Sequence, residues 1–140
     1  MSVKTAVFYW TMTGNTEMMA EAIAEGAGAD LIKVADYSGN IEEYDRIAFG
    51  CPAMDEESLE ATEFEPFFSS VENKLNGKTI ALFGSYDWGD GQWMRDWTAR
   101  ARADGAVIIG GEGLIANNTP DDDDLAACRE LGKKLSEENA

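Results

Sequence analysis

The sequence contains no histidine, so the side chain that most often shuttles protons and binds metals in proteins is missing. Cysteine is scarce as well: Cys51 and Cys128 stand far apart and form no Cys-x-x-Cys pair. Two isolated thiols cannot build a zinc site, and we expect no metal site. The sixth residue after Cys51 is Glu57 rather than arginine, unlike the nucleophile loop of cysteine phosphatases. We expect both cysteines to be buried, reduced thiols.

Basic residues are also few, with 11 Lys and Arg against 27 Asp and Glu and a net charge of −16. This balance excludes the basic face that nucleic-acid binding requires. It favours encounter with basic partners, and it is equally typical of general solubility or salt adaptation. No apolar run reaches the roughly 18 residues of a membrane span, and the first residues lack the apolar stretch of a signal peptide. We therefore expect a cytoplasmic protein.

Apolar runs alternate with segments of helical periodicity along the 140 residues, which we interpret as one domain, 1–140. Strands separated by helices imply an α/β fold, with a parallel sheet covered by helices on both faces. Strands are expected at 5–10, 31–34, 46–50, 79–85 and, interrupted by Gly110 and Gly111, at 106–109 with 114–115. Helices are expected at 17–27, 60–75, 92–103 and 121–137, with a helical turn at 41–44.

The most informative stretch is Thr11-Met12-Thr13-Gly14-Asn15-Thr16, which lies between the first strand and the first helix. Backbone N–H groups and hydroxyls at a helix N-terminus, where the helix dipole is positive, form a place for a phosphate. The stretch contains no Lys or Arg, so the donors would be neutral. It is not a P-loop and lacks G-x-G-x-x-G. Alone, it is more typical of an ordinary turn.

Two further loops are expected at the same sheet edge, where ligands bind in such folds: 51–57 with Met54, and 85–91 with Trp88. Large flat or polarisable side chains on loops suggest contact with a ligand, although both could simply cover the core. Taken together, the three loops predict a slot for a phosphorylated, planar aromatic ligand.

The same residues resemble a known family. The 11–16 stretch looks like the T/S-x-T-G-x-T phosphate loop of flavodoxins. Gly50-Cys51-Pro52-Ala53-Met54, Glu63-Phe64-Glu65-Pro66-Phe67 and the segment 84–94 resemble the short-chain, clostridial-type members. The resemblance covers essentially the whole chain. It implies a three-layer flavodoxin-like fold with a five-stranded parallel sheet in the order 2-1-3-4-5, and FMN as the cofactor.

The resemblance also implies which residues contact FMN. Thr11, Thr13, Asn15 and Thr16 would hold the phosphate, Met54 would cover the inner ring face, and Trp88 would stack outside. The backbone of 55–57 would meet the flavin N5 edge, while the Glu57 carboxylate and the amides of 86–88 would address the pyrimidine side. The full expected set is Thr11, Met12, Thr13, Gly14, Asn15, Thr16, Pro52, Ala53, Met54, Asp55, Glu56, Glu57, Ser85, Tyr86, Asp87, Trp88, Gly89 and Asn118, with Asn117 beside the last.

Four positions depart from the family pattern. Met12 stands where many relatives have a small or polar residue, and Pro52 supplies no hydroxyl where some have serine. Asp55 and Asp87 stand where glycine is frequent. Aspartate adopts a positive φ at a cost of roughly 1 kcal/mol, so Asp55 is expected to weaken the one-electron reduced state relative to glycine.

By this resemblance the chain is a monomeric, low-potential one-electron carrier rather than an enzyme, replacing ferredoxin between redox enzymes. Expected partners carry basic docking patches: ferredoxin or flavodoxin reductases, 2-oxoacid oxidoreductases, and hydrogenase or nitrogenase systems. Seven acids and no base lie between Arg46 and Lys74, which favours a strongly reducing second couple, although a solvated helix face would look the same. The alternative is a flavodoxin-fold, FMN-dependent NAD(P)H:quinone reductase. A receiver domain is not favoured, because the first strand ends in Tyr9-Trp10 without a carboxylate pair.

Overall fold

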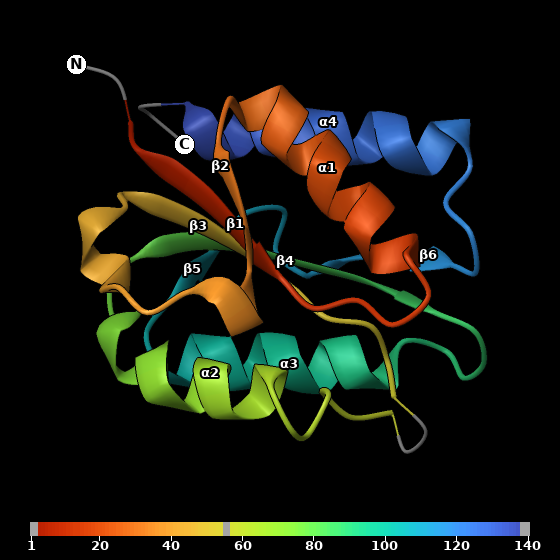
Figure 1. Ribbon diagram of the computed structural model, residues 1–140, viewed down its shortest axis with the longest axis horizontal. Coiled ribbons are helices and arrows are strands. Elements are labelled where there is room, and N and C mark those ends of the chain that lie inside the picture. The colour runs from red at the N-terminus through yellow and green to blue at the C-terminus, as the bar shows by residue number, and fades with distance from the viewer. Residues whose placement is uncertain (1–2, 55–56, 138–140) are drawn as a thin grey trace.

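A computed structural model describes residues 3–54 and 57–137. It has three layers: a parallel sheet with α1 and α4 on one face and α2 and α3 on the other (Figure 1). The strands are β1 (Thr5–Tyr9), β2 (Asp30–Lys33), β3 (Arg46–Gly50), β4 (Thr79–Tyr86), β5 (Val107–Ile108) and β6 (Leu114–Asn117). The helices are α1 (Asn15–Ala27), α2 (Phe64–Val71), α3 (Gln92–Ala103) and α4 (Asp122–Ser136), with 3-10 turns at Val34–Asp36, Ile41–Glu43 and Glu72–Lys74.

The strand order is β2-β1-β3-β4-β5, as the resemblance implied. The fifth position of the sheet is shared by two short strands, because β5 pairs with the start of β4 and β6 with its end. Gly110 and Gly111 lie between them at φ +83° and +86°, a backbone conformation that glycine adopts without strain. The predicted interruption of this strand is therefore confirmed.

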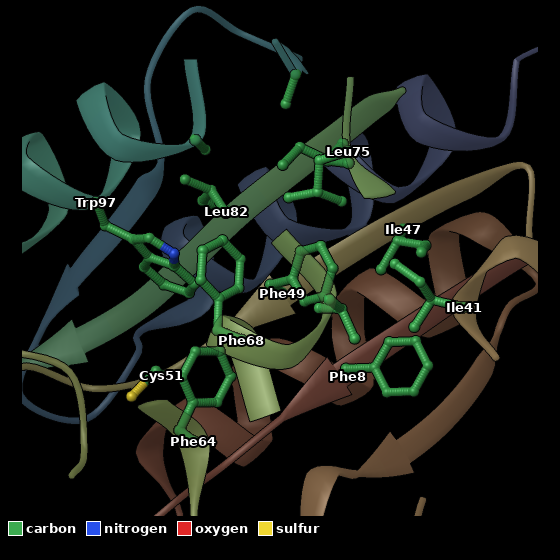
Figure 2. Close-up of a cluster of buried hydrophobic side chains, with 14 of the residues drawn as sticks. Phe8, Ile41, Ile47, Phe49, Cys51, Phe64, Phe68, Leu75, Leu82 and Trp97 are labelled. Carbon is green, nitrogen blue, oxygen red and sulfur yellow. The ribbon is translucent and has the colours of Figure 1, made fainter. Parts of the chain in front are cut away.

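The three central strands are almost entirely buried, which explains their continuous apolar sequences. On the α2 and α3 side the core is aromatic, and Figure 2 shows Phe8, Phe49, Phe64, Phe68 and Trp97 packed together.

On the other face of the sheet, α1 and α4 approach each other closely. A Cβ on Gly26 would lie 2.0 Å from the Arg129 carbonyl oxygen, and one on Gly132 would lie 2.1 Å from the Ile23 carbonyl oxygen. Any larger residue at either glycine would force α1 and α4 apart.

The helix predicted at 60–75 is shorter in the structure, where α2 begins only at Phe64 and gives way to a 3-10 turn after Val71. The reason is Glu60, whose buried carboxylate accepts the backbone N–H groups of Thr62, Glu63 and Phe64. Because of these hydrogen bonds, residues 60–63 form a turn around the Glu60 carboxylate, and the helix begins only after it. Pro66 lies in the first turn of α2, as expected, where its missing N–H has no intrahelical partner to lose.

The last helix agrees with its prediction, because Asp121 is its N-cap and forms a reciprocal capping box with Asp124. Cys51 and Cys128 are buried free thiols, and burial raises the pKa of each to about 12. Both are thus protonated and unreactive at neutral pH. Within residues 3–54 and 57–137, no helix combines the length and the apolar character needed to cross a bilayer.

Candidate functional site

A cavity opens at the carboxyl edge of the sheet, where the three expected loops meet. The space between its walls, counted together with the part that is open to solvent, is about 570 Å³. The chain leaves β1 toward β2 on one side and returns to β3 on the other, so the cavity lies at the point where the strand order reverses. Its lining residues are Thr11, Met12, Thr13, Thr16, Pro52, Ala53, Met54, Ser85, Tyr86, Asp87 and Trp88.

The first loop is held by its own residues. Gly14 has φ +96° and precedes α1 as its N-cap, and its N–H donates to the Thr11 hydroxyl at 3.1 Å. Thr16 is buried one residue further into the helix, whereas Met12 is 63% exposed at the rim. Gly14 and Asn15 are not among the lining residues, but they shape the turn that carries the lining threonines.

The second loop is tied to the third. The Ala53 N–H donates to the Ser85 carbonyl oxygen at 3.0 Å, and the Glu57 N–H donates to the Met54 carbonyl oxygen at 2.8 Å. Pro52, Ala53 and Met54 line the cavity. Asp55 and Glu56, which the sequence assigns to the same loop, lie outside the described residues.

Glu57 does not line the cavity. One oxygen of its carboxylate accepts the Gln92 N–H at 3.0 Å, at the N-terminus of α3, where the helix dipole favours a negative charge. Gly89 lies against the same carboxylate, and a Cβ there would come within 2.7 Å of the Glu57 carboxyl carbon. Glu57 and Gly89 therefore join the second loop to the start of α3, and the sequence did not indicate this.

The third loop presents an indole to the cavity. Trp88 is 58% exposed and lines the cavity beside Tyr86 and Asp87. Asn118 is not a lining residue, but its N–H donates to the Tyr86 carbonyl oxygen at 2.7 Å, and the Asn117 side-chain amide donates to the same oxygen at 3.3 Å. The asparagines thus support the backbone of this loop from β6.

The match to a family model decides which family the chain belongs to. The model described as Flavodoxin matches residues 7–132. This chain belongs to the flavodoxin family. It is 45% identical to the flavodoxin of Clostridium beijerinckii over 136 residues, covering 93% of this chain and 97% of that protein. It is 44% identical to the flavodoxin of Megasphaera elsdenii over 133 residues, covering 91% and 94%.

A solved relative agrees in three dimensions. The solution structure of the two-electron reduced Megasphaera elsdenii flavodoxin has a TM-score of 0.83 and 38% identity, and the match covers 94% of this chain and 98% of that one. Flavodoxins are small electron carriers that bind FMN, and this flavodoxin is one of them. The quinone reductase considered from sequence is not favoured, since these relatives match over almost their whole length and are named flavodoxins.

Two further polar contacts hold the end of the strand that leads into the first loop, and nothing in the sequence indicated them. The Tyr9 hydroxyl donates to the Glu17 carboxylate at 2.7 Å, and the Trp10 indole N–H donates to the Glu63 carboxylate at 2.9 Å. Burial and the neighbouring Glu17 raise the pKa of Tyr9 above its usual value, so it stays protonated. These bonds fasten the end of β1 to α1 and to the residue before α2.

Proposed function

We propose that this flavodoxin carries single electrons at low potential, with FMN in the cavity, and supplies them to redox enzymes in place of a ferredoxin. The observation that carries the proposal is the cavity itself. Its lining includes a neutral phosphate loop at the N-terminus of α1, the loop residue Met54 and the exposed loop residue Trp88. A phosphate at one end and a flat, stackable ring at the other is the chemistry that such a lining fits.

The phosphate end is assigned to residues 11–16. The support is the position of Thr11, Thr13 and Thr16 on the lining, next to the first amides of α1. The amides of Met12 and Asn15 complete this set of neutral donors. Pro52 faces the cavity without a hydroxyl or an N–H, so the donors come from the α1 side and from β4.

The ring is assigned to the space between Met54 and Trp88. An indole that is 58% exposed gains stabilisation when an aromatic ring covers it. Tyr86 and Asp87 offer backbone groups to the polar edge of the ring, and Ala53 adds apolar surface. The assignments to Asp55 and Glu56 remain predictions from the sequence. Bound FMN supplies the redox chemistry by taking up and releasing single electrons.

The charges of the chain support a low potential. Glu57, Glu63 and Asp87 lie at the cavity edge of the sheet, and no lining residue within the described ranges is a lysine or arginine. Added negative charge on a ring in this surrounding is disfavoured by repulsion and by the absence of a compensating cation. The protein thereby makes the second electron harder to add and more strongly reducing.

The proposed partners are redox proteins with basic docking patches, because a net charge of −16 steers encounter with positive surfaces. They include ferredoxin or flavodoxin reductases, 2-oxoacid oxidoreductases, and hydrogenase or nitrogenase systems. The protein acts as a cytoplasmic monomer and turns over no substrate of its own. Electron-transfer rates to such partners fall as salt is raised, and rates that are independent of salt would contradict this docking.

An anaerobic redox titration of the FMN-loaded protein, followed by absorbance, tests the function. We expect two separate one-electron steps, with the second at the lower potential. A single two-electron step would contradict a one-electron carrier. An NAD(P)H oxidation assay on the isolated protein separates the reductase alternative, since sustained turnover with a quinone would favour it.

A further inference from the structure

Ser85 is the one residue among those described that contacts the two other cavity loops through both its backbone and its side chain. It is the seventh residue of β4 and is 5% exposed. Its carbonyl oxygen accepts the Ala53 N–H at 3.0 Å. Its N–H donates to the Thr16 hydroxyl oxygen at 3.3 Å, and the two hydroxyl oxygens lie 2.8 Å apart as a hydrogen-bonded pair.

The two hydroxyl groups of this pair carry one proton more than the hydrogen bond between them uses. Two hydroxyls own two protons, and the bond between them uses one. Within residues 3–54 and 57–137, neither hydroxyl takes part in any other hydrogen bond, and Thr16 is only 1% exposed. A buried O–H without an acceptor is costly, so the second proton needs an acceptor. Both residues line the cavity, which is where an acceptor can lie.

Either hydroxyl can donate within the pair, and the position of Thr16 favours the arrangement in which Thr16 keeps the free proton. Thr16 lies in the first turn of α1, beside the amides that suit an anion. If the Ser85 N–H and O–H both donate to the Thr16 oxygen, both lone pairs of that oxygen are occupied. The Thr16 proton must then point away from Ser85, toward the phosphate end of the cavity.

We propose that Ser85 is a positioning residue of the phosphate site, which holds the Thr16 hydroxyl so that its proton donates to the phosphate of bound FMN. The proposal rests on the phosphate site assigned above. It places part of the control of phosphate binding on β4, 69 residues from the loop that carries the donor.

Binding titrations of the full-length apoprotein with FMN and with riboflavin, which lacks the phosphate, test the proposal. Ser85→Ala removes only the hydroxyl and keeps the backbone bonds. We expect it to weaken FMN binding at least about tenfold, as for loss of a hydrogen bond to a charged group, and riboflavin binding less than about twofold. Ser70→Ala is the matched control, because its exposed hydroxyl donates only to the Phe67 carbonyl oxygen of its own helix. It should change neither affinity.

A double variant separates a role of Ser85 in positioning the Thr16 hydroxyl from a direct contact between Ser85 and the phosphate. Thr16→Val keeps the side-chain shape and removes the donor, so Ser85→Ala should change FMN affinity less than about twofold when added to it. Equal weakening of FMN and riboflavin by Ser85→Ala would overturn the proposal, as would no weakening of FMN or an undiminished effect in the Thr16→Val background. Wild-type protein that binds riboflavin as tightly as FMN would overturn the phosphate site itself. The two failures are therefore distinguishable.

Discussion

Glu60 provides the sharpest test of how this fold is held together. The residue is only 5% exposed, and its carboxylate accepts four hydrogen bonds. One oxygen accepts the N–H groups of Glu63 and Phe64 at 2.7 and 2.9 Å, and the other accepts the N–H of Thr62 at 2.8 Å together with the Thr62 hydroxyl. In Glu60→Gln one of these oxygens becomes an NH₂ group, which cannot accept. Two donors then lose their partner.

The structure gives the size of the loss in two ways. Losing two hydrogen bonds to a charged group costs at least about 3 kcal/mol. Independently, burial raises the pKa of Glu60, but the four hydrogen bonds outweigh it and lower the pKa from 4.5 to about 2. That difference corresponds to about 3 kcal/mol of folding stability at neutral pH, since each pKa unit is worth about 1.4 kcal/mol. We therefore expect Glu60→Gln to lower the free energy of unfolding by about 3 kcal/mol at pH 7.

The pH dependence follows from the direction of the change. The pKa is lower in the folded state, so the stabilisation is complete above about pH 5 and is lost as the pH falls toward the folded value. Urea unfolding followed by circular dichroism should show the gap between wild type and Glu60→Gln shrinking to under half by about pH 3. Glu25→Gln, an exposed change on α1, is the control. A gap under about 0.5 kcal/mol at pH 7, or one that is unchanged at pH 3, would refute the reasoning.

Three further substitutions test other parts of the chain. Asp104→Asn should stabilise the protein by about 0.5–1 kcal/mol at pH 7 in thermal unfolding, because burial raises the pKa of this carboxyl at the negative end of α3. The gain should shrink at lower pH, where the carboxyl is protonated, and a lower melting temperature of the variant would contradict the prediction. Gly14→Ala (φ +96°) should lower the free energy of unfolding by at least about 1 kcal/mol and weaken FMN binding. Gly28→Ala (φ +64°), at the other end of α1, should lower stability alone. Equal FMN affinities in the two variants would count against the assignment of the phosphate to the 11–16 loop. Trp10→Phe removes an exposed hydrogen bond from the indole N–H to Glu63 and should lower the free energy of unfolding in urea by about 1 kcal/mol or less. A loss above about 3 kcal/mol would mean that this hydrogen bond is not the main contribution of the indole.

The sheet could be predicted because its information is local. Runs such as Ala6-Val7-Phe8-Tyr9 are apolar on both faces, which only a strand covered on both sides requires. The phosphate loop could be located because Gly14 combines a left-handed turn with a helix start. The Met54 and Trp88 loops then followed from the topology, since loops after parallel strands share one edge of the sheet.

What could not be predicted depends on partners distant in sequence. Phe64 and the apolar residues after it keep helical spacing, so nothing local showed that Glu60 is buried and delays the helix. The sequence likewise did not indicate that the Glu57 carboxylate accepts the N–H of Gln92, 35 residues along the chain. A carboxylate on a loop has many possible donors within reach, and only the packed structure selects one. For the same reason, the sequence could place Ser85 at the cavity but could not pair it with Thr16.

Glu60 and Ser85 both form hydrogen bonds to the start of the loop that follows β3. The Glu60 N–H donates to the Cys51 sulfur at 3.4 Å where the loop leaves β3, and the Ser85 carbonyl accepts the Ala53 N–H two residues further on. The two residues on either side of Pro52 are thus held by contacts within the protein, directly before Met54. A loop that is ordered in advance has less conformational freedom to lose on binding, so more of the contact energy appears as affinity. Order in advance matters in the same way for the 11–16 loop, because without Lys or Arg its affinity for a phosphate depends on neutral donors that are already in place.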